Sequence, residues 1–301
     1  MYDAIIVGGG PAGMTAALYL LRAGKNALIL EKESFGGQIA RSPRLENYPT
    51  IVSISGMEWS DQLFEQVIGL GAEFDIANVE GITKTEKGFI VHTEYGDKEC
   101  KSVIIATGCD HRKLGLERED ELVGKGISYC ATCDGSFFAG KEVLVIGDAN
   151  TALQYTIALS PTVKKITLIT LFDRFFADEI LVKRLKALPN LTVFHNKNAI
   201  EFLGKDELTG VKFEDTKTKE TEVFSCDGAF ICIGQVPHNE PFAEFVELSK
   251  GFIVTDETMA TKTPGIYACG DCREKKIRQV ITASSDGAIA GVSCANYLNS
   301  L

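Results

Sequence analysis

A glycine-rich turn near the start of the chain constrains the fold more than any other feature of the sequence. Residues 8–13 read Gly-Gly-Gly-Pro-Ala-Gly and lie between an apolar run, residues 4–7, and a helix-like run, residues 14–22. A second apolar run, residues 27–30, ends at Glu31. This order of strand, G-x-G-x-x-G turn, helix, strand and acid is typical of a dinucleotide-binding unit. The glycines let the pyrophosphate approach the backbone, and the acid accepts a hydrogen bond from a ribose hydroxyl. The sequence therefore predicts an N-terminal Rossmann-like domain.

The same order of elements recurs in the middle of the chain with a degraded turn. An expected strand over residues 142–146 is followed by residues 147–152, which read Gly-Asp-Ala-Asn-Thr-Ala, then by a helix and a strand over 165–170. Ala149 replaces the middle glycine, and Asp148 puts a negative charge where a pyrophosphate would lie. We expect a second Rossmann-like domain with a damaged nucleotide site.

A C-x-x-C motif precedes this second unit. Residues 130–135 read Cys-Ala-Thr-Cys-Asp-Gly, a spacing that suits a redox disulfide or half of a zinc site. Asp134 follows the second cysteine and is placed to exchange a proton with a thiolate. Cys269 and Cys272 form another C-x-x-C, which leaves zinc bound by both pairs as an alternative. The remaining cysteines are expected to be ordinary core or loop residues: Cys100, Cys109, Cys226, Cys232 and Cys294.

Length, charge and cysteine content exclude several classes of protein. With 301 residues the chain is long enough for two domains, and its net charge of −10 argues against a nucleic acid partner. No apolar run is long enough to span a membrane, and the first residues run directly into a strand with no signal peptide. The nine cysteines are an odd number, which points to reduced thiols in the cytoplasm.

These motifs, taken in order, resemble the low-molecular-weight thioredoxin reductases over essentially the full length of the chain. The matching segments are GGGPAG, GGQ, ENYP, ATG, CATCDG, I-G-x-x-P near residue 233, GIYACGD and RQ-x-x-T-A. The resemblance implies an α/β homodimer whose subunits have two Rossmann-like, three-layer ββα domains. Residues 1–113 and 242–301 would form a discontinuous FAD-binding domain, and residues 114–241 an inserted redox-disulfide domain with a degenerate NAD(P)-type fold.

The resemblance also implies roles for individual residues. Cys133 would meet the flavin, Cys130 would attack the disulfide of thioredoxin, and Asp134 would protonate the leaving thiolate. The inserted domain would swing between the flavin and thioredoxin. The residues expected to line the FAD site are Gly8, Gly10, Pro11, Ala12, Glu31, Gln38, Asn47, Thr107, Gly108, Gly270, Asp271, Arg278, Gln279 and Val280.

The nucleotide site of the inserted domain departs from the family pattern. Where the family has His-Arg-Arg and a later Arg to hold the 2′-phosphate of NADPH, this chain has Thr170, Leu171, Phe172 and Phe176. Loss of three guanidinium groups predicts loss of NADPH binding. The chain therefore resembles, more narrowly, the ferredoxin-dependent flavin thioredoxin reductases.

Two other functions stay open from the sequence: an NAD(P)H-dependent reductase with an atypical nucleotide site, and a non-catalytic FAD-bound redox sensor. A ferredoxin is acidic, so a basic docking patch is expected. One candidate cluster is Arg273, Lys275, Lys276 and Arg278, and the other is Lys183, Arg184 and Lys186.

Overall fold

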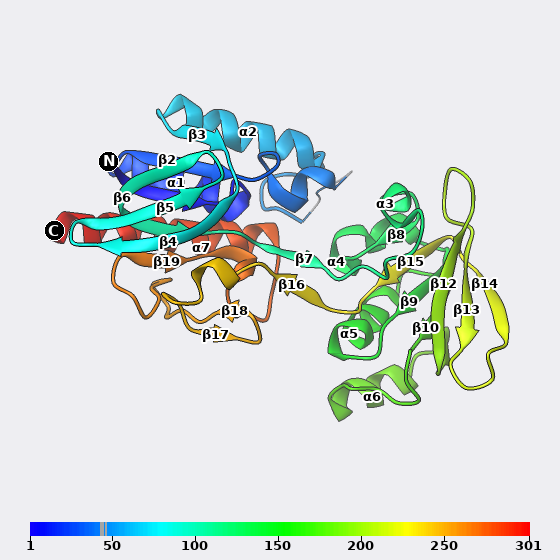
Figure 1. Ribbon diagram of the computed structural model, residues 1–301. Helices are drawn as coiled ribbons and strands as arrows, with labels where there is room; N and C mark the ends of the chain where they lie inside the picture. Colours follow the sequence, from blue (N-terminus) through cyan, green and yellow to red (C-terminus); the bar gives the residue numbers. More distant parts are fainter. Residues whose placement is uncertain (43–44, 46) are drawn as a thin grey trace. The chain divides into compact units, whose positions relative to one another are not determined.

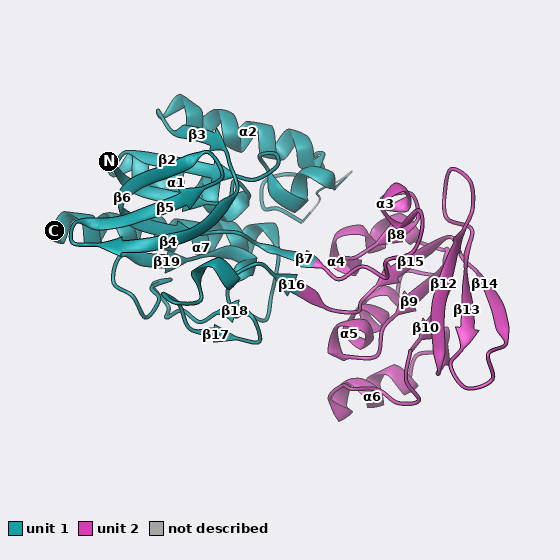
Figure 2. Ribbon diagram, in the orientation of Figure 1, with its two compact units in different colours: residues 1–110, 236–301 teal, residues 111–235 magenta. Residues whose placement is uncertain are grey.

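The computed structural model describes residues 1–42, 45 and 47–301, and this part of the chain forms two compact units (Figure 2). Unit 1 comprises Met1–Asp110 and Val236–Leu301, and unit 2 comprises His111–Gln235. The junctions lie a few residues before those expected from the sequence. Each unit is built on a sheet with parallel strands at its centre, which confirms the predicted α/β class with Rossmann-like domains.

The main sheet of unit 1 has the strand order β3-β2-β1-β6-β5-β4, with β19 also paired to β6. Strand β1 has parallel partners on both sides, so that Val7 lies opposite Leu30 and Ile105. Alternate residues of β1 point to opposite faces, and both faces are covered: Ile6 packs into one buried cluster and Ile5 into another. The strands are β1 (Tyr2–Val7), β2 (Ala27–Glu31), β3 (Glu73–Ile76), β4 (Val79–Thr85), β5 (Gly88–Thr93), β6 (Gly96–Ile105) and β19 (Ile266–Ala268).

Helices α1 (Pro11–Arg22), α2 (Gly56–Gly69) and α7 (Val280–Ser300) belong to unit 1 (Figure 1). Helices α2 and α7 each begin with a capping interaction. The Ser55 hydroxyl accepts a hydrogen bond from the first turn of α2, and Gln279 and Thr282 form a capping box at the start of α7. Shorter elements of unit 1 are β17 (Leu248–Ser249), β18 (Phe252–Ile253), and the 3₁₀ helices η1 (Gly37–Arg41), η3 (Glu240–Phe242) and η4 (Gly270–Cys272).

The parallel sheet of unit 2 has the strand order β11-β10-β9-β15-β8, and a separate antiparallel sheet has the order β12-β13-β14. Along β9, Leu144 and Val145 enter different buried clusters, so both faces of the sheet are covered. The strands are β8 (Ile127–Ser128), β9 (Glu142–Ile146), β10 (Lys165–Ile169), β11 (Leu191–Phe194), β12 (Lys197–Leu203), β13 (Gly210–Asp215), β14 (Thr221–Ser225) and β15 (Gly228–Ile231). The helices are α3 (Glu119–Leu122), α4 (Ala131–Asp134), η2 (Gly135–Phe138), α5 (Asn150–Leu159) and α6 (Glu179–Lys186).

The chain passes between the units in two segments, β7 (Cys109–His111) and β16 (Gln235–Pro237). These two strands pair with each other in a small sheet (Figure 1). None of the helices in the described residues is both long enough and apolar enough to cross a membrane.

Candidate functional site

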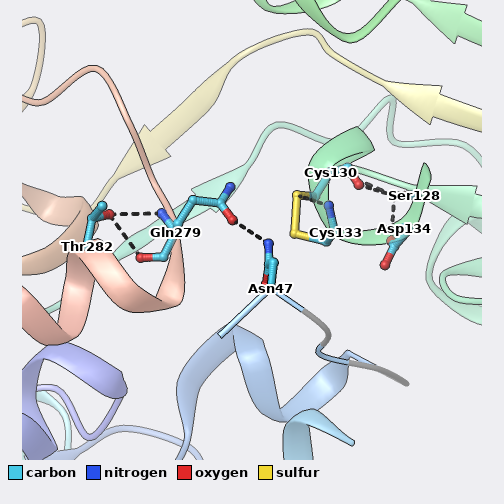
Figure 3. The surroundings of a disulfide bond; sticks show 7 residues. All are labelled: Asn47, Ser128, Cys130, Cys133, Asp134, Gln279 and Thr282. Atoms are coloured by element: carbon cyan, nitrogen blue, oxygen red, sulfur yellow. Dashed lines mark hydrogen bonds between the residues drawn. A yellow bond between two sulfur atoms is a disulfide. The ribbon is translucent and has the colours of Figure 1, made fainter. Parts of the chain in front are cut away.

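The C-x-x-C motif lies at the start of helix α4. Cys130 and Cys133 are joined by a disulfide bond (Figure 3). Cys130 is the N-cap of α4, and its sulfur accepts a hydrogen bond from the backbone N–H of Cys133 at 3.1 Å. The bond is the oxidised form of the dithiol that the spacing predicts.

Asp134 lies beside this disulfide in a partly buried position. Its Oδ2 accepts a hydrogen bond from the Ser128 hydroxyl at 2.6 Å (Figure 3). Its Oδ1 is buried and has no hydrogen-bond partner among the described residues. Burial raises the pKa of Asp134 above its usual range, and the hydrogen bond from Ser128 opposes part of that rise. A carboxyl group whose pKa is raised in this way, beside a disulfide, is placed to exchange a proton with a thiolate.

Ser128, which the sequence motifs did not single out, also orders the first cysteine. Its hydroxyl oxygen accepts a hydrogen bond from the backbone N–H of Cys130 at 3.0 Å while contacting the Asp134 carboxylate. One hydroxyl therefore ties the cysteine to the acid. The only signal in the sequence is a small hydroxyl residue two positions before the motif.

A buried glutamate supports the residue that precedes the disulfide. The Tyr129 hydroxyl donates to Glu119 Oε1 at 2.7 Å, and Glu119 also accepts hydrogen bonds from the backbone of Leu114 and Gly115. The ring of His111 stacks on that of Tyr129, with centroids 5.1 Å apart. Burial and the Glu119 carboxylate raise the pKa of Tyr129, so its hydroxyl stays protonated and serves as a donor.

The glycine-rich turn of unit 1 has the form that a dinucleotide requires. Glu31, at the end of β2, is buried, and its Oε2 accepts a hydrogen bond from the backbone of Gly9 at 2.7 Å. A Cβ at Gly13 would collide with the carbonyl oxygen of Gly8, so close packing of helix on strand requires that glycine. Gly10 differs, because a Cβ there would meet nothing closer than 3.9 Å. Packing of the chain does not require this glycine, whereas the dinucleotide-binding pattern uses a glycine here so that the pyrophosphate can approach the backbone.

Asp271, in η4, supplies a second sign of a ligand in unit 1. Its Oδ1 is buried and has no partner among the described residues, a costly state unless another molecule donates to it. Burial raises the pKa of Asp271, and the charges of Lys275 and Arg278 oppose that rise. The Arg278 guanidinium lies over the ring of Phe252, with a separation of 4.3 Å, and donates to the backbone carbonyl of Lys275 at 3.0 Å. Arg278 thus holds the loop that carries Asp271.

Other residues expected at the FAD site are placed by contacts within unit 1. Asn47 donates to Gln279 at 3.0 Å just before α7, which begins at Val280 (Figure 3). Gln38 donates to the carbonyl of Cys109 and to Asp110. Pro11 and Ala12 open α1, and Gly108 and Gly270 both have positive φ. Glu46 of the ENYP motif lies outside the described residues.

Asn239 is a further residue that sequence reasoning missed. Its side chain is buried, donates to the carbonyls of Gly251 and Cys272 at 2.8 Å each, and contacts Thr107 Oγ1 at 3.1 Å. It therefore joins Thr107 to the segment that carries Asp271. A polar residue between Pro237 and Pro241 was the only sequence signal.

The segment that follows β10 covers the degraded turn of unit 2. The backbone N–H of Phe176 donates to the carbonyl of Asp148 at 2.7 Å. Asp178 and Asn150 exchange two hydrogen bonds, of 2.8 and 3.1 Å. The N-terminus of α5, where a pyrophosphate would lie, therefore has the carboxylates of Asp148 and Asp178 close to it.

The first candidate basic cluster presents fewer free charges than its sequence indicates, because several of them are used inside unit 1. Lys275 and Arg273 form ion pairs with Asp286 of α7 at 2.8 and 3.3 Å, and only 9% and 16% of their side-chain surfaces are exposed. Arg278 is bound to backbone carbonyls, which leaves Lys276 as the exposed member. In the second cluster, Lys183, Arg184 and Lys186 on α6 are all exposed.

The described residues contain no group of three or more His, Cys, Asp or Glu side chains arranged to hold a metal ion. Cys269 and Cys272 are fully buried as free thiols. Burial raises the pKa of Cys272 to about 11 and that of Cys269 well above its ordinary value. The zinc alternative gains no support from this arrangement.

Comparisons with known proteins agree over the whole chain. Residues 2–287 match the family model described as pyridine nucleotide-disulphide oxidoreductase. The thioredoxin reductases of Treponema pallidum and Bacillus subtilis are 40% and 38% identical to this chain, cover all of it, and are themselves covered over 98% and 96% of their lengths. The crystal structure of thioredoxin reductase from Streptococcus pyogenes superposes with a TM-score of 0.95 at 37% identity, over 100% of this chain and 99% of that one.

Proposed function

Because this chain belongs to the pyridine nucleotide-disulphide oxidoreductase family, and within it to the low-molecular-weight thioredoxin reductases, we propose that it reduces the disulfide of thioredoxin with electrons from a reduced ferredoxin. FAD, the predicted cofactor, is confirmed by membership of this family. We further propose that the enzyme acts as a homodimer in the cytoplasm, in keeping with seven free, buried thiols in the described chain.

The residues of unit 1 fit FAD. Gly10 leaves room for a pyrophosphate at the start of α1, and Glu31 lies at the end of β2 to accept from a ribose. The unpartnered Oδ1 of Asp271 would accept a hydrogen bond from a ribityl hydroxyl. Bound FAD would supply the step between single-electron carriers and the two-electron reduction of a disulfide.

The residues around Cys130 and Cys133 support the thiol chemistry. In the dithiol form, the Cys130 thiolate attacks one sulfur of the thioredoxin disulfide and expels the other as a thiolate, which takes the proton of Asp134. The Cys133 thiol then attacks the Cys130 sulfur of the mixed disulfide, which breaks the bond to thioredoxin and forms the Cys130–Cys133 bond again. The proton of Cys133 passes to the released thioredoxin sulfur, so that thioredoxin leaves as a dithiol. The Oδ1 of Asp134 is buried beside the motif and has no hydrogen-bond partner among the described residues, which supports the role of Asp134 as the acid.

The observation that carries the ferredoxin proposal is the state of the nucleotide site in unit 2. Phe176 is hydrogen-bonded across the turn, and the side chains of Asp148 and Asp178 oppose a phosphate at the N-terminus of α5. Electron transfer from ferredoxin is favourable, because plant-type ferredoxins lie near −400 mV and thioredoxin near −270 mV. The difference of about 130 mV corresponds to roughly 6 kcal/mol over two electrons.

An NAD(P)H-dependent reductase is the second candidate. The thioredoxin reductases of Treponema pallidum and Bacillus subtilis are 40% and 38% identical to this chain, and their names identify the reductase without identifying its electron donor. Arg174 also gives this candidate one specific observation, because its exposed guanidinium lies 5.0 Å from the centre of the Phe176 ring and could meet a phosphate.

The donor is tested by mixing FAD-loaded protein, under anaerobic conditions, with stoichiometric NADPH or NADH in one arm and with chemically reduced ferredoxin in the other. We expect ferredoxin to bleach the flavin absorbance and support continuous reduction of thioredoxin, while the nucleotides do neither. Rapid bleaching by NADPH or NADH would refute the ferredoxin proposal. If the flavin absorbance is bleached but thioredoxin is not reduced, whichever donor is used, the result would instead favour a redox sensor.

A further inference from the structure

Unit 2 has an apolar surface beside its degraded nucleotide turn. Leu171, Phe172, Phe176 and Ile180, which we call the aromatic patch, each keep between 45% and 61% of their surface exposed. The rings of Phe172 and Phe176 meet edge to face, with centroids 5.3 Å apart. Large apolar side chains that gather on a surface mark a place where another molecule binds.

The aromatic patch is held in place by the backbone of unit 2. The carbonyl of Phe172 accepts hydrogen bonds from the Thr170 hydroxyl at 2.6 Å and from the backbone of Asn196 at 3.3 Å. The backbone of Phe176 is bound to that of Asp148 at 2.7 Å. A surface fixed in this way loses little conformational entropy when a partner covers it.

Cations lie beside two members of the aromatic patch, Phe176 and Ile180. The guanidinium of Arg174 lies over the ring of Phe176, and Ile180, Lys183 and Arg184 share one face of α6 at helical spacing. Within the described chain, no carboxylate forms an ion pair with Arg174, Lys183 or Arg184. Three acids lie in the same stretch of sequence. Asp173 pairs with Lys217, and Asp178 is bound to Asn150. Glu179 lies one helical turn before Lys183 on α6 but forms no ion pair with it within the described chain.

We propose that the aromatic patch and its cations form the docking surface for the electron donor, an acidic iron–sulfur protein. This inference rests on the proposed function and assigns the donor to one surface. The net charge of the chain is −10, so an acidic partner is repelled unless it meets a local group of free cations. Aromatic and arginine side chains are also the types enriched at the centres of protein interfaces.

The other basic cluster does not offer such a surface. Its Lys275 and Arg273 are paired with Asp286, whereas Arg174, Lys183 and Arg184 are free to meet the carboxylates of a partner. The aromatic patch also lies on the segment that crosses the nucleotide turn, so a protein bound there takes the place of the nucleotide.

The test is stopped-flow reduction of the FAD-loaded enzyme by chemically reduced ferredoxin, at low and high ionic strength. Two double variants address the surface, Lys183→Glu with Arg184→Glu and Phe172→Ala with Phe176→Ala. Lys276→Glu is the matched control, because it reverses one exposed cation in unit 1. We expect each double variant to lower the second-order rate constant by roughly tenfold or more, the charge variant to lose the salt dependence, and the control to match wild type.

Three results separate the inference from the function on which it rests. If ferredoxin reduces wild type quickly and both double variants equally quickly, the docking surface is refuted while the donor stands. If ferredoxin fails to reduce wild type and NADPH succeeds, the proposed function is refuted as well. If the Phe172→Ala and Phe176→Ala protein changes its oligomeric state in the absence of ferredoxin, the patch is an interface between copies of this chain and the inference falls. Rates for the reduction of thioredoxin by chemically reduced enzyme must stay unchanged in every variant, because Cys130 and Cys133 are untouched.

Discussion

Replacing Ser128 with alanine should shift the pH dependence of thioredoxin reduction upward. The Ser128 hydroxyl donates to Asp134 Oδ2 at 2.6 Å and so stabilises the ionised carboxylate. Burial acts in the opposite direction and is the larger effect, because the pKa of Asp134 lies above its ordinary value. Removing the hydroxyl leaves burial unopposed, and the pKa of Asp134 must rise further.

The size of the shift follows from the bond that is lost. A hydrogen bond to a charged group contributes about 1.5–3 kcal/mol, and one pKa unit corresponds to about 1.4 kcal/mol, which gives a rise of roughly 1–2 units. In its proposed role Asp134 acts in the protonated form, so the rate should fall as pH rises through the pKa of Asp134. In Ser128→Ala this fall should occur about 1–2 pH units higher than in wild type.

The assay is the single-turnover rate at which dithiol enzyme reduces thioredoxin, measured across pH. Asp134→Asn should remove the dependence on this group and slow the reaction by about a hundredfold or more at low pH, within the range expected for general acid catalysis. Ser128→Thr keeps the hydroxyl and should restore the wild-type profile. Ser136→Ala makes the same chemical change at an exposed position of η2 and serves as the control. A Ser128→Ala profile that superimposes on that of wild type would refute the reasoning.

Three further predictions concern the disulfide, the cofactor and the fold. Cys133→Ser should retain FAD and the dimer but abolish thioredoxin reduction, and normal turnover in that protein would contradict its assigned role. Asp271→Ala should weaken FAD binding by at least about tenfold, because a hydrogen bond to a buried charged acceptor is lost; fluorescence titration of FAD into apoprotein measures this, and equal affinities would count against the site. Asn239→Ala removes the hydrogen bonds to the buried carbonyl of Cys272 and the part-buried carbonyl of Gly251, and should cost about 2–4 kcal/mol in urea unfolding. Asn198→Ala, at an exposed position, is a control expected near zero.

Features encoded by neighbouring residues were predictable from the sequence. The turn at residues 8–13 and the C-x-x-C motif act through spacing along the chain, so their local structure could be read directly. Asn239 could not be assigned in this way, because it joins Thr107, which is 132 residues away, to the loop that carries Asp271. Ser128 is close in sequence to Asp134, but its role depends on how the chain turns into α4.

The basic cluster near residue 275 shows why charge in a sequence is a poor guide to charge on a surface. From the sequence alone, Lys275 and Arg273 are expected to be solvated cations. In the structure both form ion pairs with Asp286, a buried acid on α7. Breaking such a pair leaves a buried charge unpaired, so these side chains are committed to the fold. A single acid in a helix of small and apolar residues was the available signal, since such an acid needs a partner.

In the proposed function, the same few residues account for both the loss of the nucleotide site and the aromatic patch. Phe172 and Phe176 stand where cations would hold a phosphate, and the backbone of Phe176 fixes the segment against the turn at Asp148. Decay of an unused site would leave this exposed segment free to carry any polar side chain, because a surface position imposes little demand on packing. Large apolar residues there expose apolar surface to water, and no contact within the isolated chain offsets that unfavourable free energy. A partner that buries them removes that cost, and the free cations on α6 restrict the partner to an acidic one. In the proposed enzyme, the change that disfavours a nucleotide is therefore the change that suits a protein donor.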